Sequence, residues 1–194
     1  MKQLLLDFTR APAPTFANFV HGGNAELVSA IEAAAKAGHH VQTTPLGGSH
    51  QQLLDQVNAF RRGKAASGRA LSTRLSLQRG MFLVRDERER QHIAGRAYTY
   101  YKSFDNVFGG PGIVDRGVIR PLPRAQTMEE LASNILLCGR HEMIDRLSVY
   151  AELGIDEVLT TSNFGQDQPE ILDMMSRFAE EVMPQLINYK TKAA

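Results

Sequence analysis

Apolar positions recur at helical spacing in six segments of this chain, and polar residues mark where those segments begin. The first segment ends at Gly38, a residue type that commonly closes a helix. In four of the others, serine, threonine or aspartate precedes glutamine or glutamate by three positions, which is the spacing of a reciprocal N-terminal cap. The predicted helices are residues 25–37, 49–62, 86–103, 127–136, 140–154 and 167–186.

Three shorter segments have the pattern of β-strands. Residues 39–44 stop at a proline, residues 74–84 alternate and then become continuously apolar, and residues 156–162 follow a helix end. Strands that alternate with helices are typical of an α/β protein with a parallel sheet. We therefore predict one α/β domain over residues 25–194.

Two stretches lack any periodic apolar face. Residues 1–24 contain prolines and glycines without periodicity, which predicts an extended N-terminal segment. Residues 105–126 are also rich in glycine and proline, and a loop of that length inside a domain is usually functional or mobile.

Composition narrows the function classes. A formal net charge of +1 over 194 residues predicts no binding to nucleic acid, and no apolar run is long enough to cross a membrane. Cys138 is the single cysteine, so an internal disulfide is excluded and a reducing, cytoplasmic location is expected.

Few residues have the spacing of a catalytic or metal site. Cys138 and His141 form one ligand pair without a second, so no metal site is predicted. The glycines of residues 46–49 precede a helix and are either an anion site or, more often, a simple turn. Polar residues follow the last strand, where a barrel enzyme places active-site groups, although ordinary capping of the loop explains them equally well. These candidates are Thr160, Thr161, Ser162 and Asn163.

Residues 33–186 resemble the C-terminal half of the luciferase-like flavin monooxygenases. The resemblance is carried by "RPLPRAQTMEELASNILLCGRHEMIDRLSVYAELGIDEVLTTSNFG" and "EILDMMSRFAEEVMPQL", together with "LSLQRGMFLVRDERE". It implies part of a (β/α)8 barrel, with residues 74–84 as strand seven and residues 156–162 as strand eight. It also implies an enzyme that oxidises a small organic substrate with O2 and reduced FMN.

This resemblance leaves out the earlier strands, which carry most flavin contacts and the usual catalytic base. No catalytic residue can be carried over, and an incomplete or inactive fragment is expected. The two barrel strands would lack neighbours, so we expect a homo-oligomer or another chain to cover their apolar inner faces. The residues expected on those faces are Leu75, Leu77, Phe82, Val158 and Leu159.

Residues 1–30 resemble a different family, the DnaA-related replication inactivators. "QLLLDF" followed by "PTFANFVHGGNAELV" is similar to the peptide with which that family docks on the replicative sliding clamp. The alternative function is therefore a non-enzymatic protein that binds the clamp through its terminal hexapeptide. The implied contact residues are Gln3, Leu4, Leu6 and Phe8.

Overall fold

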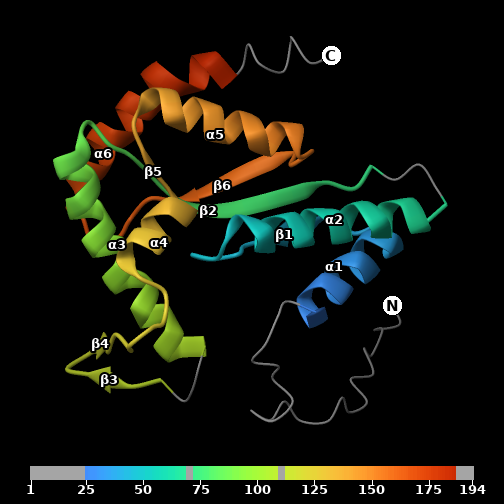
Figure 1. The fold of residues 1–194 in the computed structure, drawn as a ribbon, viewed down its shortest axis with the longest axis horizontal. Coiled ribbons are helices and arrows are strands. Elements are labelled where there is room, and N and C mark those ends of the chain that lie inside the picture. Colours follow the sequence, from blue (N-terminus) through green and yellow to red (C-terminus); the bar gives the residue numbers. More distant parts are fainter. Residues whose placement is uncertain (1–24, 69–71, 109–111, 187–194) are drawn as a thin grey trace, which may run out of the picture.

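The computed structural model describes residues 25–68, 72–108 and 112–186 (Figure 1). The predicted extended segment, residues 1–24, lies outside these ranges, so its conformation stays a prediction. The proposed clamp contacts also fall there and stay predictions: Gln3, Leu4, Leu6 and Phe8.

A long central strand organises the sheet. This strand, β2 (Leu75–Leu83), runs parallel to β1 (Val41–Thr43) and β6 (Glu157–Thr161), which pair with its first six residues. Its last three residues pair in parallel with β5 (Leu136–Cys138). Among the described strands, β1 and β6 pair with β2 only, so each leaves one edge without a strand partner.

Helices connect these strands and cover one face of the sheet. In Figure 1, α2 and α5 flank the central strands, and α3 leads from the end of β2 to a small antiparallel hairpin. The elements are α1 (Ala25–Ala37), α2 (His50–Ala66), α3 (Glu87–Phe108), β3 (Val114–Asp115), β4 (Val118–Ile119), α4 (Met128–Asn134), α5 (Arg140–Glu152), α6 (Gln168–Arg177) and the π-helical turn η1 (Phe178–Val182).

The covered face carries the apolar side chains of the strands. Leu75 and Leu77 are 1% and 0% exposed, and they pack in one cluster with the apolar stripe of α2. The hydroxyl of Thr43 donates a buried hydrogen bond of 2.6 Å to Gln56 Oε1 of α2. Burial of this apolar stripe is the main force that holds the helices on the sheet.

The contact between α1 and α2 depends on a glycine. A Cβ atom at Gly63 would lie 2.1 Å from the carbonyl oxygen of Glu32 and 2.9 Å from Cβ of Ala35. The two helix backbones therefore approach more closely than any other residue at position 63 allows.

Most predicted elements are confirmed. The structure gives α1 the predicted bounds, and strands are found within all three predicted strand segments. Reciprocal caps are present at Ser49 and Thr127, while Asp167 accepts a hydrogen bond from the backbone N–H of Glu170. The α/β class with parallel strands is therefore confirmed.

The segment after Thr127 differs from the prediction. The helix ends at Asn134, and residues 136–138 form β5 instead of continuing the helix. All three residues of β5 are buried, and their backbone pairs with the end of β2. A three-residue apolar run has no period of its own, so its tertiary pairing partner decides its structure.

The glycine-rich stretch also has more structure than predicted. The helix α3 continues to Phe108, and the β3–β4 hairpin follows it. Asn106, which is 2% exposed, fixes this hairpin. Its Nδ2 donates to the carbonyls of Ile113 and Arg120, and its Oδ1 accepts from the Ile113 N–H.

The last helix is not a uniform α-helix, because α6 passes into a π-helical turn at Phe178. No helix within the described ranges is long and apolar enough to cross a membrane.

Candidate functional site

The face of the sheet that the helices leave open is lined by polar side chains. Gln42 Nε2 donates to Gln78 Oε1 at 3.4 Å, and Gln78 Nε2 donates to Thr161 Oγ1 at 3.0 Å. On the same face, the Ser76 hydroxyl donates to Glu157 at 2.8 Å. We call these five residues the open face. In a closed barrel, one face of every strand points to the barrel interior and the helices cover the other.

The strand register shows that these side chains share one face. Ser76 pairs with Gln42 on one side and with Glu157 on the other, while Gly80 pairs with Thr161. Successive residues of a strand point to opposite faces, so the residues between them point toward the helices.

The expected apolar inner face is therefore wrong for most of its residues. Leu75 and Leu77 are at most 1% exposed, because helices of this same chain cover them, whereas the buried Phe82 has the same strand parity as Ser76 and Gln78 and therefore lies on the side of the open face. Val158 is half-buried on the helix side, and Leu159 on the open face is 36% exposed. The polar residues of β2, Ser76 and Gln78, alternate with the leucines, and this pattern was available in the sequence.

Two aromatic side chains cover the open face at its C-terminal end. A Cβ atom at Gly80 would lie 2.6 Å from the Tyr101 hydroxyl oxygen and 3.3 Å from Cζ of Phe164. Tyr101 comes from α3, and Phe164 comes from the loop after β6. Position 80 has room only for a glycine beneath this pair.

Tyr101 and Phe164 belong to a cluster of four rings, and Tyr100 contacts three of them edge-to-face. Burial raises the pKa of Tyr101 to about 12, while Arg79 and Arg124 partly offset the shift. The Tyr101 hydroxyl is therefore neutral at pH 7 and can donate a hydrogen bond.

A hollow of about 530 Å³ lies on the outer side of the aromatic cluster. Its walls include His92, Arg96 and Tyr100 of α3, together with Phe164. Nη1 of Arg96 donates to the Gly165 carbonyl at 3.0 Å and lies 3.5 Å from Glu170. This arginine therefore ties the loop after β6 to α3.

The residues predicted at the end of β6 do not form one group. Thr161 lies on the open face with Gln78, whereas Thr160 lines a cavity on the helix side of the sheet. Asn163 Oδ1 accepts a hydrogen bond from the Gly165 N–H. This is the ordinary capping of the loop that was the alternative to an active-site role. Ser162 is half-buried between them. Of the four, only Thr161 is placed beside other candidate groups, and a functional role for these residues stays a prediction.

The turn at residues 46–49 uses three of its four backbone donors within the turn. The N–H groups of Leu46, Gly48 and Ser49 donate to Thr44, Pro45 and Gln52 within the turn. Its carbonyls accept from side chains elsewhere in the fold. Arg79 donates to Leu46 and Gly48, while Gln126 and Asn134 donate to Gly47. The simple turn is the better explanation of the glycine pair.

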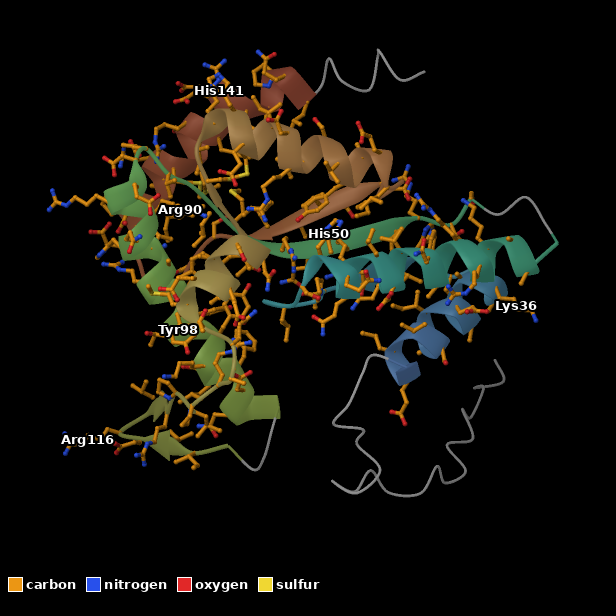
Figure 2. The ribbon with its side chains drawn as sticks, viewed as in Figure 1. Lys36, His50, Arg90, Tyr98, Arg116 and His141 are labelled. Carbon is orange, nitrogen blue, oxygen red and sulfur yellow. The ribbon has the colours of Figure 1, made fainter. Side chains whose placement is uncertain are left out.

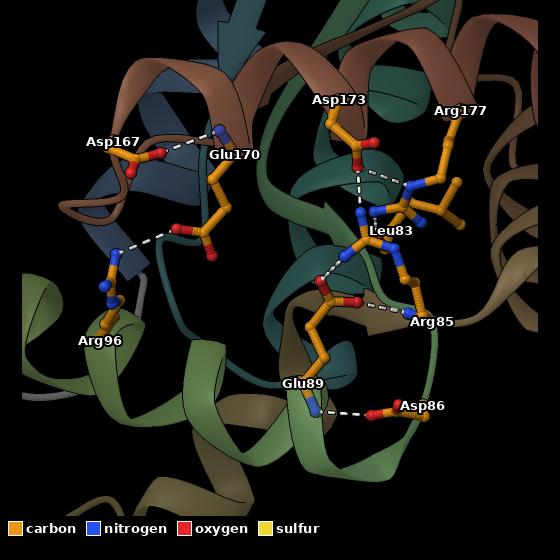
Figure 3. Close-up of polar contacts among 9 residues, drawn as sticks. All are labelled: Leu83, Arg85, Asp86, Glu89, Arg96, Asp167, Glu170, Asp173 and Arg177. Carbon is orange, nitrogen blue, oxygen red and sulfur yellow. Dashed lines mark hydrogen bonds and ion pairs between the residues drawn. The ribbon is translucent and has the colours of Figure 1, made fainter.

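An ion-pair network fastens α6 to the end of β2 (Figure 3). Arg85 pairs with Glu89 of α3 and with Asp173 of α6. Arg177 pairs with the same Asp173 at 3.0 Å, and it donates to the Leu83 carbonyl at 3.0 Å. These contacts hold α3 and α6 together just beyond the C-terminal end of the sheet.

Cys138 is not placed for nucleophilic chemistry. It is 1% exposed, and burial raises the pKa of its thiol to about 11. No group of three or more metal-ligating side chains occurs among the residues that the structure describes.

Comparisons with known proteins agree with this arrangement. The chain is 24% identical over 160 residues to the oxygenase component of the flavin-dependent trigonelline monooxygenase of Acinetobacter baylyi, covering 79% of this chain and 44% of that protein. The chain is similar to a flavin-dependent monooxygenase. Its fold also matches the crystal structure of the monooxygenase RslO1 from Streptomyces bottropensis. That match has a TM-score of 0.53 at 18% identity and covers 84% of this chain and 46% of RslO1.

The fold prediction is therefore confirmed as α/β, with βα units arranged as in part of a barrel. No protein-family model matches the sequence. The chain spans less than half the length of each of these two proteins. The predicted similarity to flavin-dependent monooxygenases is confirmed at the level of a distant relative, 24% identical in sequence. The narrower luciferase-like assignment is part of the proposal below.

Proposed function

We propose that this chain supplies the C-terminal βα units of a luciferase-like flavin monooxygenase. In this role, the open face forms part of the barrel wall beside the flavin. The observation that carries the proposal is the open face itself. A sheet face that is polar, hydrogen-bonded and uncovered by the helices the structure describes fits a barrel interior and not an independent core.

The residues of this chain fit one part of a flavin. Gln42, Gln78 and Thr161 offer amide and hydroxyl groups that can bond the heteroatoms along the edge of a flavin ring. Tyr101 and Phe164 offer aromatic surface at the same end of the sheet. When bound, a reduced flavin would supply the activation of O2.

The phosphate of FMN has no matching cradle on the open face. The side chains described there carry a single charge, the carboxylate of Glu157, which repels a phosphate. The remaining flavin contacts must then come from outside the described residues. We propose that a complementary barrel portion covers the open face and pairs with the free edges of β1 and β6. A second copy of this chain is the alternative occupant.

Within this assembly, the chain's own groups have defined tasks. The amide of Gln78 is held between Gln42 and Thr161, so it presents a fixed polar edge to a bound ring. The neutral hydroxyl of Tyr101 retains its proton at pH 7 and closes the C-terminal end of the face. The proposed substrate is a small organic compound, and trigonelline is the compound named for the Acinetobacter relative.

The test is reconstitution. The full chain is co-expressed with the portion of the Acinetobacter relative that it does not match, and FMN binding is measured by fluorescence quenching. We expect a stoichiometric complex that binds FMN and consumes O2 when reduced flavin is supplied. The chain alone is expected to do neither.

A matched pair of variants identifies the surface. Gln78→Leu removes the central amide of the open face, whereas Gln51→Leu makes the same change on the exposed surface of α2. We expect Gln78→Leu to weaken FMN binding by roughly tenfold or more, as the loss of a buried hydrogen-bonding group does. Equal affinities for the two variants would contradict the assignment.

A further inference from the structure

Arg79 carries a buried positive charge without a carboxylate partner. Its side chain leaves the middle of β2 on the helix-covered face, and the residue is 3% exposed. Nη1 and Nη2 donate to the carbonyls of Leu46 and Gly48 at 3.0 and 3.2 Å. Nε is buried without a hydrogen-bond partner, and no ion pair to Arg79 occurs in the described part of the chain. Burying a guanidinium without a counter-charge is unfavourable.

This arginine lines a cavity of about 340 Å³ that holds two further basic side chains. Arg146 enters it from α5, and His50 enters it from the first turn of α2, where Figure 2 labels it beside the central strands. The end of α4 contributes Ser133 and Asn134. The positive end of the α2 dipole points toward the same space, because His50 is the first residue of that helix.

Negative charge is scarce around the cavity. No aspartate or glutamate is among its described lining residues. Arg146 has a carboxylate partner in Glu142, which lies 3.6 Å from Nη1 of Arg146 and whose side chain is 54% exposed. Nη2 of Arg146 donates to the Ser133 carbonyl at 2.7 Å. One exposed carboxylate therefore pairs with one of the two arginines, and the cavity carries a net positive charge.

We propose that this cavity binds a small oxyanion, namely a phosphate group. Arg79 and Arg146 would be its main ligands, with His50 and the start of α2 beside them. The planar guanidinium matches the oxygen geometry of phosphate, and the Arg79 guanidinium brings a buried charge whose Nε has no hydrogen-bond partner. The volume admits a phosphate together with a small organic group.

The anion site is separate from the open face. Gln78 and Gly80 point to the open face, so Arg79 between them points to the opposite side of the sheet. The proposal therefore does not depend on flavin chemistry. A phosphate ester could bring the anion as well as free phosphate, and FMN is one such ester.

The test is titration of the full chain with inorganic phosphate, against sodium chloride of equal ionic strength. We expect saturable heat of binding and a rise in Tm of roughly 4–8 °C at about 30 times the dissociation constant. Arg146→Gln should weaken phosphate binding at least tenfold. Arg140→Gln removes the same charge from an exposed position on the same helix and should leave binding unchanged. Arg79 also holds the turn after β1 through its two hydrogen bonds, so its replacement would disturb the fold. The variant used in the test is therefore Arg146→Gln.

Parallel titrations with FMN and riboflavin separate the two sources of phosphate. Protection by FMN that depends on Arg146, without protection by riboflavin, would show that an ester brings the anion. Saturable binding of inorganic phosphate alone supports the free ion. The proposal is overturned if neither phosphate nor FMN protects more than chloride does. It is also overturned if Arg140→Gln weakens binding as much as Arg146→Gln.

Discussion

Gly80 offers a direct test that α3 and the loop after β6 cover the end of the open face. In the variant Gly80→Ala, the new methyl group would lie 2.6 Å from the Tyr101 hydroxyl oxygen, whereas ordinary contact begins near 3.4 Å. Tyr101 is 4% exposed and packed against Phe164, so it cannot withdraw freely. Overpacking of this kind costs about 1–3 kcal/mol.

Part of that cost is offset in the unfolded state. Replacing glycine by alanine reduces the entropy of the unfolded chain and stabilises by about 0.4–1 kcal/mol where the native backbone tolerates it. The net expected loss for Gly80→Ala is therefore about 0.5–2 kcal/mol. Removing the hydroxyl in Tyr101→Phe takes away the clashing atom, so the double variant should regain most of the loss.

The assay is urea unfolding followed by far-UV circular dichroism, because the chain contains no tryptophan. A double-mutant cycle gives the coupling between the two positions, which we expect to be about 1–3 kcal/mol. Gly95→Ala is the control. A Cβ atom there meets nothing within 4 Å, so the change should stabilise α3 by roughly 0.5–1 kcal/mol. Additive effects of Gly80→Ala and Tyr101→Phe would refute the packing of Tyr101 over Gly80.

Two further predictions concern stability. The Cys138 pKa is raised to about 11 from 9.0, so the folded state holds a proton that the unfolded state loses first. The free energy of unfolding should therefore fall between about pH 9 and 11, by up to about 1.4 kcal/mol per pH unit, and Cys138→Ala should flatten that slope. In the hairpin, Asn106→Ala removes three hydrogen bonds and should speed tryptic cleavage at the exposed Arg116 roughly tenfold. The exposed control Asn58→Ala should not change the rate; equal cleavage in both variants would count against the role of Asn106.

The predicted elements agree best where a local signal is sufficient. The reciprocal caps at Ser49 and Thr127 mark the starts of α2 and α4, and Gly38 follows the end of α1. Such signals rest on bonds between residues three or four positions apart, so they can be read from the sequence. By contrast, β5 owes its conformation to pairing with β2, which lies over 50 residues away in the sequence. The three apolar residues of β5 are too few for their spacing to predict a strand.

The candidate site was predicted less completely than the fold. The prediction grouped residues by their position at the end of a strand, whereas the side of the sheet to which each residue points decides which residues lie together. Reading Thr160 and Thr161 as one group ignored the alternation that sends them to opposite sides of the sheet. The same alternation in β2 separates Gln78, on the open face, from the buried Arg79. A buried arginine without a counter-charge cannot be recognised from sequence, because its partners come from distant elements.

The central claim is that the open face becomes part of a flavin site only when another chain covers it. The most direct measurement is an FMN titration of the purified chain, followed by fluorescence quenching, with light scattering on the same sample. The account predicts no tight binding by the chain alone, and it predicts FMN binding by the complex with a complementary barrel portion that is lost in Gln78→Leu. A monomer that binds FMN tightly by itself, with binding unaffected by either Gln78→Leu or Arg146→Gln, would contradict it.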